Sequence, residues 1–290
     1  MIMADTMLKF KDDNFSGDFL SKDELRTMCP KVFCEAPTNP KLSQHYVQAN
    51  TEMVIDDLAK MGWLPVAAQQ CRAKRNSSGI RSFHMVAFQN PEVKLMRKEV
   101  GSNNDGVVEA YPRIILTNSH DGFNCFKFMV GLYRLVCSNG LVVATESFAE
   151  ISIKHINYDF EELRKMVAQV IVQVEEQAVC MSKMLQTDIS NEQAKKLAES
   201  AIRIHKGLGE NEQLNVDNEV LDAMITPTRK EDIGTDIWRR FNVIQENIMQ
   251  GNFAIHNAKG KLRKARPITS ITKNIDVNKK LFTQAYALCA

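Results

Sequence analysis

Residues 111–143 constrain the fold more than any other stretch, because apolar, β-branched runs alternate there with short polar turns. The run 113–117 is Arg-Ile-Ile-Leu-Thr, and Asn-Ser-His-Asp-Gly follows it at 118–122. Asp-Gly favours the backbone of a tight hairpin turn, and Asn and Ser can bond to their own backbone. A second polar turn follows at 138–140. The pattern predicts antiparallel strands that meet at two polar turns.

The flanking sequence extends this pattern to an α+β fold. Residues 51–61 have the apolar spacing of an amphipathic helix, and residues 63–156 are mostly β-rich. Helical spacing then predicts helices at 160–185, 190–206, 217–225, 235–250 and 274–288. We therefore expect a mostly antiparallel β-sheet core with a C-terminal helical set packed on it. Residues 1–40 would form an N-terminal extension and residues 41–290 a single domain, β-rich over 63–156 and helical over 158–290.

The composition is that of an ordinary folded protein, with 44% hydrophobic and 25% charged residues. No apolar run approaches the ~18–20 residues of a membrane helix, and the N-terminus lacks the apolar segment of a secretory signal. The seven cysteines are scattered without a CxxC pair, which argues against a disulfide scaffold or a zinc ribbon. Phosphate-cradling glycine motifs are absent. We expect a cytoplasmic protein that has no cofactor and no membrane contact.

The polar turn at 118–122 has two interpretations. His120 and Asp121 would form a general base or a metal-binding pair if both side chains faced the same cleft. Alternatively, the residues are chosen only for the backbone geometry of a turn, and residue type alone favours this second interpretation. Cys137 would be a candidate nucleophile if the fold brought His84 and His120 near it, although a free cysteine in an apolar strand is more often a core residue. The spacing of the histidines predicts no metal site.

Two basic segments indicate a different kind of site. The net charge of the chain is only +2, so binding to nucleic acid would depend on local patches. Between residues 256 and 280 there are eight cations and one acid. Cations set against phosphates release counterions, which makes such clusters typical of nucleic-acid binding. The alternative is a solvated surface that acidic residues elsewhere balance. The candidate phosphate-binding residues are Arg72, Lys74 and Arg75 in one segment, and Lys259, Lys261, Arg263, Lys264 and Arg266 in the other.

Four sets of residues in the chain look familiar as sequence motifs. They are Ser-Gln-His-Tyr-Val at 43–47 with Gly-Trp at 62–63, Phe-His-Met-Val-Ala-Phe at 83–88, Thr-Asn-Ser-His-Asp-Gly at 117–122 with Arg-Leu-Val-Cys-Ser-Asn-Gly at 134–140, and Trp238 with 242–250 and Asn278. In these segments the chain resembles the phage- and plasmid-borne "domain of unknown function 932" family, also called the YafZ/YfjQ-like proteins. The resemblance spans about residues 40–288. It implies a gene carried among replication, recombination and anti-restriction genes, and no known activity, so no catalytic residue can be carried over. Arg134 and Asn139 belong to this signature although a hairpin does not need them.

We therefore expect a non-catalytic accessory protein in the cytoplasm of a bacterial host, which binds single- or double-stranded DNA during replication, recombination or protection of mobile DNA. Arg134 and Asn139 would lie near the sheet turns, and the two basic segments would share one surface. One alternative is a metal-assisted hydrolase acting on nucleic acid through His120 and Asp121. Another is a virion or anti-defence protein that binds a host or phage protein. An oligomer is compatible with each of these hypotheses.

Overall fold

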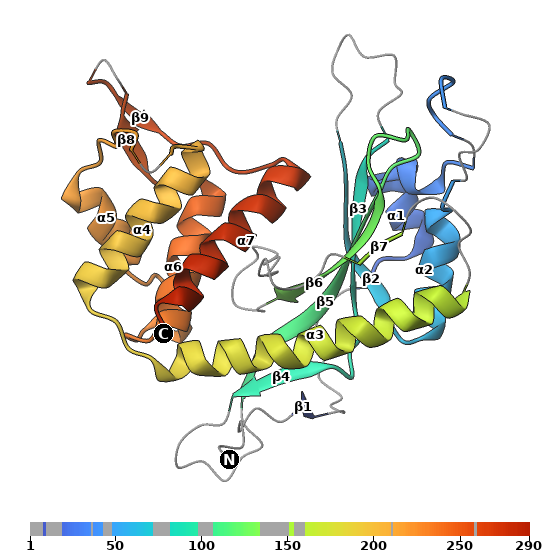
Figure 1. Ribbon diagram of the computed structural model, residues 1–290, viewed down its shortest axis with the longest axis horizontal. Coiled ribbons are helices and arrows are strands. Elements are labelled where there is room, and N and C mark those ends of the chain that lie inside the picture. The colour runs from blue at the N-terminus through green and yellow to red at the C-terminus, as the bar shows by residue number, and fades with distance from the viewer. Residues whose placement is uncertain are drawn as a thin grey trace. The chain divides into compact units, whose positions relative to one another are not determined.

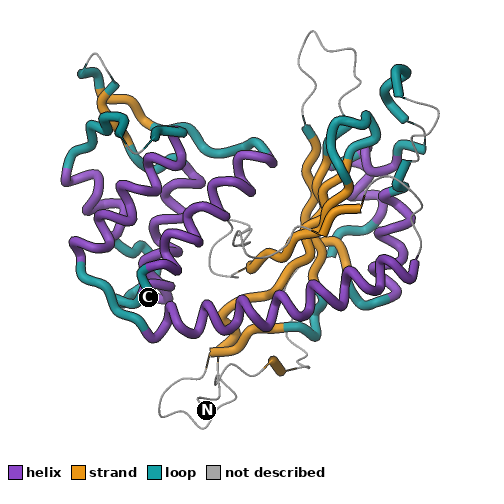
Figure 2. The backbone as a smooth tube through the Cα atoms, viewed as in Figure 1, coloured by secondary structure: helices purple, strands orange, loops and turns teal. Residues whose placement is uncertain are grey.

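The computed structural model describes residues 8–9, 19–35, 37–42, 48–71, 82–97, 107–133, 151–153, 160–209, 211–257 and 260–290. Contacts between them group the chain into two compact units. The sheet unit comprises the described residues up to 133 together with 151–176, and the helical unit comprises 177–290. Helices and antiparallel strands occur together, so the α+β class expected from the sequence is confirmed (Figures 1 and 2). This grouping into two units does not test whether residues 41–290 form a single domain, which stays a prediction.

A seven-stranded antiparallel sheet forms the centre of the sheet unit. Its long strand β5 (Val107–Asn118) pairs with β3 (His84–Gln89) and β4 (Lys94–Arg97) along one edge and with β6 (Phe126–Tyr133) along the other. The remaining strands are β1 (Leu8–Lys9) beside β4, β2 (Leu64–Gln70) beside β3 and β7 (Ile151–Ile153) beside β6. The strand expected at 113–117 is therefore confirmed as the inner part of β5, because strands border it on both edges.

The register around β5 explains why the polar turn is where it is. His84 pairs with Asn118, and Leu116 pairs with Phe128. Ile114 and Ile115 are both buried, and successive residues of a strand point to opposite faces. Both faces of the sheet are therefore covered at this point. Residues 118–122 emerge from a strand that is buried on both sides, which places them at the edge of the core rather than on an open hairpin.

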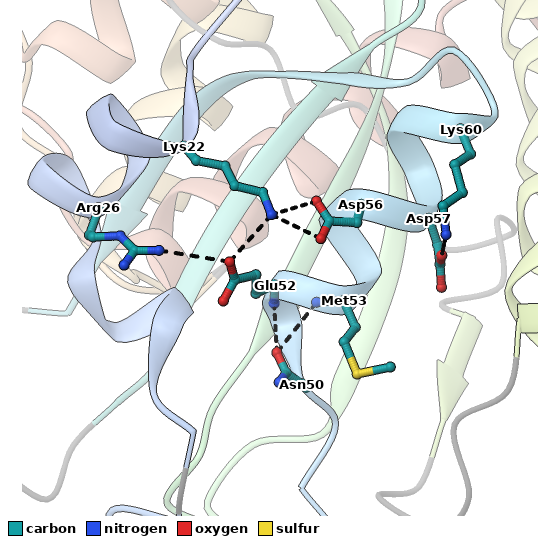
Figure 3. Close-up of polar contacts among 8 residues, drawn as sticks. All are labelled: Lys22, Arg26, Asn50, Glu52, Met53, Asp56, Asp57 and Lys60. Carbon is teal, nitrogen blue, oxygen red and sulfur yellow. Dashed lines mark hydrogen bonds and ion pairs between the residues drawn. The ribbon is translucent and has the colours of Figure 1, made fainter.

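Two short helices accompany the sheet unit, α1 (Lys22–Met28) and α2 (Thr51–Lys60), with the 3-10 helix η1 (Pro30–Phe33) between them. The Ser21 hydroxyl and the Glu24 carboxylate cap α1 reciprocally, as the spacing of the two residues predicts. Lys22 Nζ lies 3.3 Å from Glu52 Oε1 and 2.8 Å from Asp56 Oδ1, so α1 is tied to α2 (Figure 3). These ion pairs are largely exposed and therefore contribute little to stability.

The first residue of α2 is not its cap. The side chain of Asn50 accepts hydrogen bonds from the backbone N–H groups of Glu52 and Met53 (Figure 3). Thr51, which its residue type and position predict as the N-cap, instead lies inside the first turn and is fully buried. Its hydroxyl is therefore available to groups on the sheet. Helix α3 (Phe160–Gln186) follows β7 and passes from the sheet unit into the helical unit at residue 177.

The helical unit contains α4 (Asn191–Lys206), α5 (Asn218–Ile225), α6 (Ile237–Gln250) and α7 (Ile271–Ala287), together with the 3-10 helix η2 (Lys230–Asp232). Helices α4, α6 and α7 all contact one another (Figure 1). Trp238 and Phe241 on α6 are fully buried, and Phe241 packs edge-on against Phe282 of α7. Aromatic residues at helical spacing are typical of the buried face of an amphipathic helix, and both lie there.

Between α6 and α7 the chain forms a short antiparallel hairpin, β8 (Ala254–His256) with β9 (Leu262–Lys264), which the sequence pattern did not suggest. Gly251 ends α6 with φ at +69°, in the left-handed region that glycine tolerates best. A Cβ atom at this position would lie 2.7 Å from the carbonyl carbon of Arg266. The close passage of residues 265–266 over Gly251 therefore sets the position of the basic segment.

Candidate functional site

The polar turn of residues 118–122 begins with four fully buried polar residues, Asn118, Ser119, His120 and Asp121. The Asn118 side-chain amide donates to the carbonyl oxygen of Ala49 at 3.1 Å and to the Thr51 hydroxyl at 2.9 Å. The Ser119 hydroxyl accepts from the backbone N–H of Asn124 at 3.1 Å. The turn is therefore bonded both to itself and to the start of α2, and it does not project into solvent.

The carboxylate of Asp121 is occupied by backbone groups. One oxygen accepts from the N–H of Ser82 at 2.9 Å, and the other accepts from the N–H of Phe123 at 2.9 Å. The Ser82 hydroxyl accepts in turn from the N–H of His120 at 2.7 Å. These bonds satisfy amide groups that would otherwise be costly to bury. They give Asp121 a role in holding the turn against residue 82.

His84 is the second histidine of this buried cluster, and its ring centroid lies 5.0 Å from that of His120. Its Nδ1–H donates to the carbonyl oxygen of Ser82 at 2.7 Å, because a carbonyl can only accept. Its Nε2 must then accept from the Thr51 hydroxyl at 2.9 Å if the ring is neutral. Burial is the main cause that lowers the pKa of His84 to about 3. The neutral ring that burial favours is therefore compatible with both of these hydrogen bonds.

This geometry bears on the hydrolase hypothesis. His120 and Asp121 come from one turn, but both side chains are fully buried, and a general base must reach the proton that it removes. In the part of the chain that the structure describes, no group of three His, Cys, Asp or Glu side chains is placed to hold a metal ion. The hydrogen bonds of the buried cluster join α2, β3 and β5.

Several candidate residues lie outside the described residues. They are Arg72, Lys74 and Arg75 of the first basic segment, Arg134, Cys137 and Asn139 of the family signature, and Lys259. Their expected roles stay predictions, as does the common surface for the two basic segments.

The second basic segment does take part in a site of the helical unit. Arg263 and Lys264 of β9 and the following Arg266 line a pocket of about 690 Å³. The other lining residues come from elsewhere in the unit, His205 and Lys206 from the last turn of α4 and Lys273 from the first turn of α7. We call this site the cationic pocket. Lys261 lies one residue before β9 and is not among the lining residues.

Contacts among backbone and ring atoms hold the cationic pocket in place. His205 Nε2 donates to the carbonyl oxygen of Arg266 at 3.2 Å, and the N–H of Ala265 donates to the carbonyl oxygen of Phe253 at 2.8 Å. The rings of His205 and Phe253 meet edge-on, with centroids 5.1 Å apart. The end of α4 and the chain after β9 are therefore fixed to each other, and the cationic side chains extend from fixed backbone.

Like charges dominate the electrostatics of the cationic pocket. None of its lining residues is acidic, and none of its five Lys and Arg side chains forms an ion pair with a carboxylate of the described residues. Partial burial and the nearby Lys273 ammonium lower the pKa of Lys206. Burial and Lys273 also lower the pKa of His205. Elsewhere in the unit cations have acidic partners, as Lys280 has in Asp276 at 3.0 Å. The repulsion within the pocket would be relieved by a bound anion.

Sequence reasoning missed His205 and Lys206 as site residues and did not single out Lys273. The first two belong to the last turn of α4, where basic residues are expected because they complement the helix dipole. Their position therefore gave no sign of a site. Only the packing of α4 and α7 beside β9 brings them to the basic segment.

The fold and the pocket define an α+β protein whose helical unit carries a pocket lined by cationic side chains. The family model described as "Domain of unknown function (DUF932)" matches residues 41–282, so the chain belongs to this family. It is 29% identical over 272 residues to the UPF0380 protein YafZ of Escherichia coli K12, a match that covers 93% of this chain and 91% of YafZ. The UPF0380 protein YfjQ of the same organism is 28% identical with the same coverage. No solved structure matches the chain.

No helix within the described ranges is long and apolar enough to cross a membrane.

Proposed function

We propose that this protein is a non-catalytic nucleic-acid-binding accessory protein, which acts in the replication, recombination or protection of mobile DNA. The observation that carries the proposal is the cationic pocket, where five Lys and Arg side chains converge and no described carboxylate pairs with them. Neutralising several phosphates at once supplies most of the affinity of sequence-independent binding. Arg263 and Lys264 are exposed on β9, so a nucleic-acid strand can reach them.

The test is a salt titration of binding to single- and double-stranded oligonucleotides, followed by fluorescence anisotropy. We expect the logarithm of the binding constant to fall linearly with the logarithm of salt concentration. In the double variant Arg263→Gln/Lys264→Gln, the slope on duplex DNA should decrease by about 0.9 for each phosphate that the protein no longer neutralises. Absence of binding to both kinds of oligonucleotide at low salt would refute the proposal.

The matched control removes two positive charges from the same unit outside the pocket. Lys195 pairs with Asp222 at 2.8 Å, and Lys280 pairs with Asp276 at 3.0 Å. The variant Lys195→Gln/Lys280→Gln should therefore keep the slope of the unmodified protein. An equal decrease in both double variants would mean that net charge, rather than the pocket, determines binding.

One observation favours the alternative of a virion or anti-defence protein that binds a protein partner. Val172 and Val179 of α3 are 55% and 51% exposed, and seven residues apart they lie on one face of the helix. If the anisotropy experiment shows no binding, and Val172→Glu/Val179→Glu abolishes the capture of a host or phage protein that the unmodified protein retains in a pull-down, the protein-binding alternative becomes the better account.

A further inference from the structure

The cationic pocket differs from a surface that only follows a nucleic-acid backbone. It is a concavity of about 690 Å³, within the range of pockets that enclose small ligands. Three separate elements supply its cations, the end of α4, the segment of β9 with Arg266, and the start of α7. A backbone of phosphodiesters presents single charges spaced along a strand. A concave wall with five cations instead concentrates positive charge at one place.

The pocket offers little to a nucleobase. Among the described residues, its lining includes no Phe, Tyr or Trp side chain, although stacking on such rings is the usual way to hold unpaired bases. The ring of Phe253 lies 5.8 Å from Lys206 Nζ, but this side chain is only 4% exposed, so a base cannot stack on it. Recognition in this pocket therefore depends on charge and hydrogen-bond donors.

His205 adds a buried donor that responds to charge. Its side chain is 5% exposed, its Nε2 donates to Arg266, and its Nδ1 has no hydrogen-bond partner among the described residues. Lys206, Lys273 and burial all disfavour the protonated ring, and the carbonyl of Arg266 favours it. A bound dianion would reverse this balance, since an opposite charge favours the protonated form.

We propose that the cationic pocket binds a phosphomonoester, the dianionic phosphate at the end of a nucleic-acid strand or on a free nucleotide. A phosphomonoester carries about −1.5 to −2 charges at neutral pH and three acceptor oxygens, whereas each internal phosphodiester carries one. Arginine and lysine donors match such a group. If the ligand is the phosphate at the end of a nucleic-acid strand, this proposal rests on the proposed function. If the ligand is a free nucleotide, the proposal does not depend on the proposed function.

The experiment compares otherwise identical single-stranded oligonucleotides that carry a 5′-phosphate, a 3′-phosphate or only hydroxyl ends, with anisotropy as the readout at constant salt. We expect one of the phosphorylated ends to bind at least ten times more tightly than the hydroxyl form. The variants Lys206→Gln and Lys273→Gln should lose this preference while their circular dichroism stays unchanged. The control Lys195→Gln, whose charge is paired with Asp222, should keep it.

A nucleoside monophosphate, the matching nucleoside and inorganic phosphate serve as competitors. Competition by the monophosphate but not by the nucleoside supports the proposal. Equal affinity for all three oligonucleotides, with no competition by the monophosphate, overturns it and leaves the proposed function standing. Binding of the monophosphate in isothermal titration, with no oligonucleotide bound, supports the nucleotide form and refutes the proposed function.

Discussion

The side-chain amide of Asn118 donates to the hydroxyl of Thr51 over 2.9 Å, and both residues are fully buried. This bond joins the last residue of β5 to the first residue of α2. It also completes a relay, because the Thr51 hydroxyl can then donate its proton to Nε2 of neutral His84 at 2.9 Å. The start of the polar turn is thus part of the interior of the sheet unit.

Replacing Thr51 with valine tests this relay. The variant keeps the shape of the side chain but leaves the Asn118 amide and His84 Nε2 without the shared hydroxyl, so we expect the free energy of unfolding to fall by about 1–3 kcal/mol. Urea unfolding followed by Trp63 fluorescence measures the change, in a Trp238→Phe background that leaves one reporter in the sheet unit. Thr27→Val is the control, since its exposed hydroxyl bonds only within α1, and it should change stability by less than half as much.

His84 makes the stability of the sheet unit depend on pH. Its pKa is about 3 when folded, against 6.5 for an ordinary histidine, so the unfolded chain takes up a proton first as the pH falls. Stability is therefore complete above about pH 6.5 and decreases towards pH 3, by up to about 1.4 kcal/mol per pH unit. His120, Asp121 and Lys31 act on the same ring. Urea unfolding at pH 7, 6 and 5 should show a steeper loss in the unmodified chain than in His84→Gln, and equal slopes would contradict this role.

Gly122→Ala should be strongly destabilising. Gly122 has φ at +76°, and a Cβ atom there would lie 2.3 Å from Cδ2 of Leu42. The backbone conformation alone costs a non-glycine residue about 1–2 kcal/mol, and displacing Leu42 adds to it. Thermal unfolding measures the effect. Gly207→Ala, with φ at +71° and open space around the position, should show only the backbone cost.

Asp121→Asn separates a structural role from a catalytic one. An asparagine side chain has a similar shape, but it presents one donor where the carboxylate accepts from the N–H groups of Ser82 and Phe123. We expect a lower melting temperature, with a decrease in stability of about 1–3 kcal/mol, and unchanged binding of oligonucleotides at temperatures where the variant is folded. Nuclease activity that is present in the unmodified protein and absent from the folded variant would support the hydrolase hypothesis.

The sequence by itself determined where a helix begins or ends when that end depends only on residues close to it in the chain. The capping box of Ser21 with Glu24, the cap of α4 at Ser190 and its end at Gly207 all occur where the residue types predict them, because each depends on atoms within a few residues. The strand at 113–117 was equally predictable from its β-branched, apolar composition.

Tertiary structure alone decided what the polar residues do. Asn-Ser-His-Asp-Gly has the composition of an exposed turn, but its first four residues are buried because residues 38–39, Ser82 and the start of α2 close around them. The second basic segment became part of a pocket because two helices bring further cations to it. Helix α4, about 60 residues earlier in the chain, supplies His205 and Lys206, and α7, which follows a few residues later, supplies Lys273. Such contacts depend on how helices and strands pack, and no local pattern of residue types encodes them.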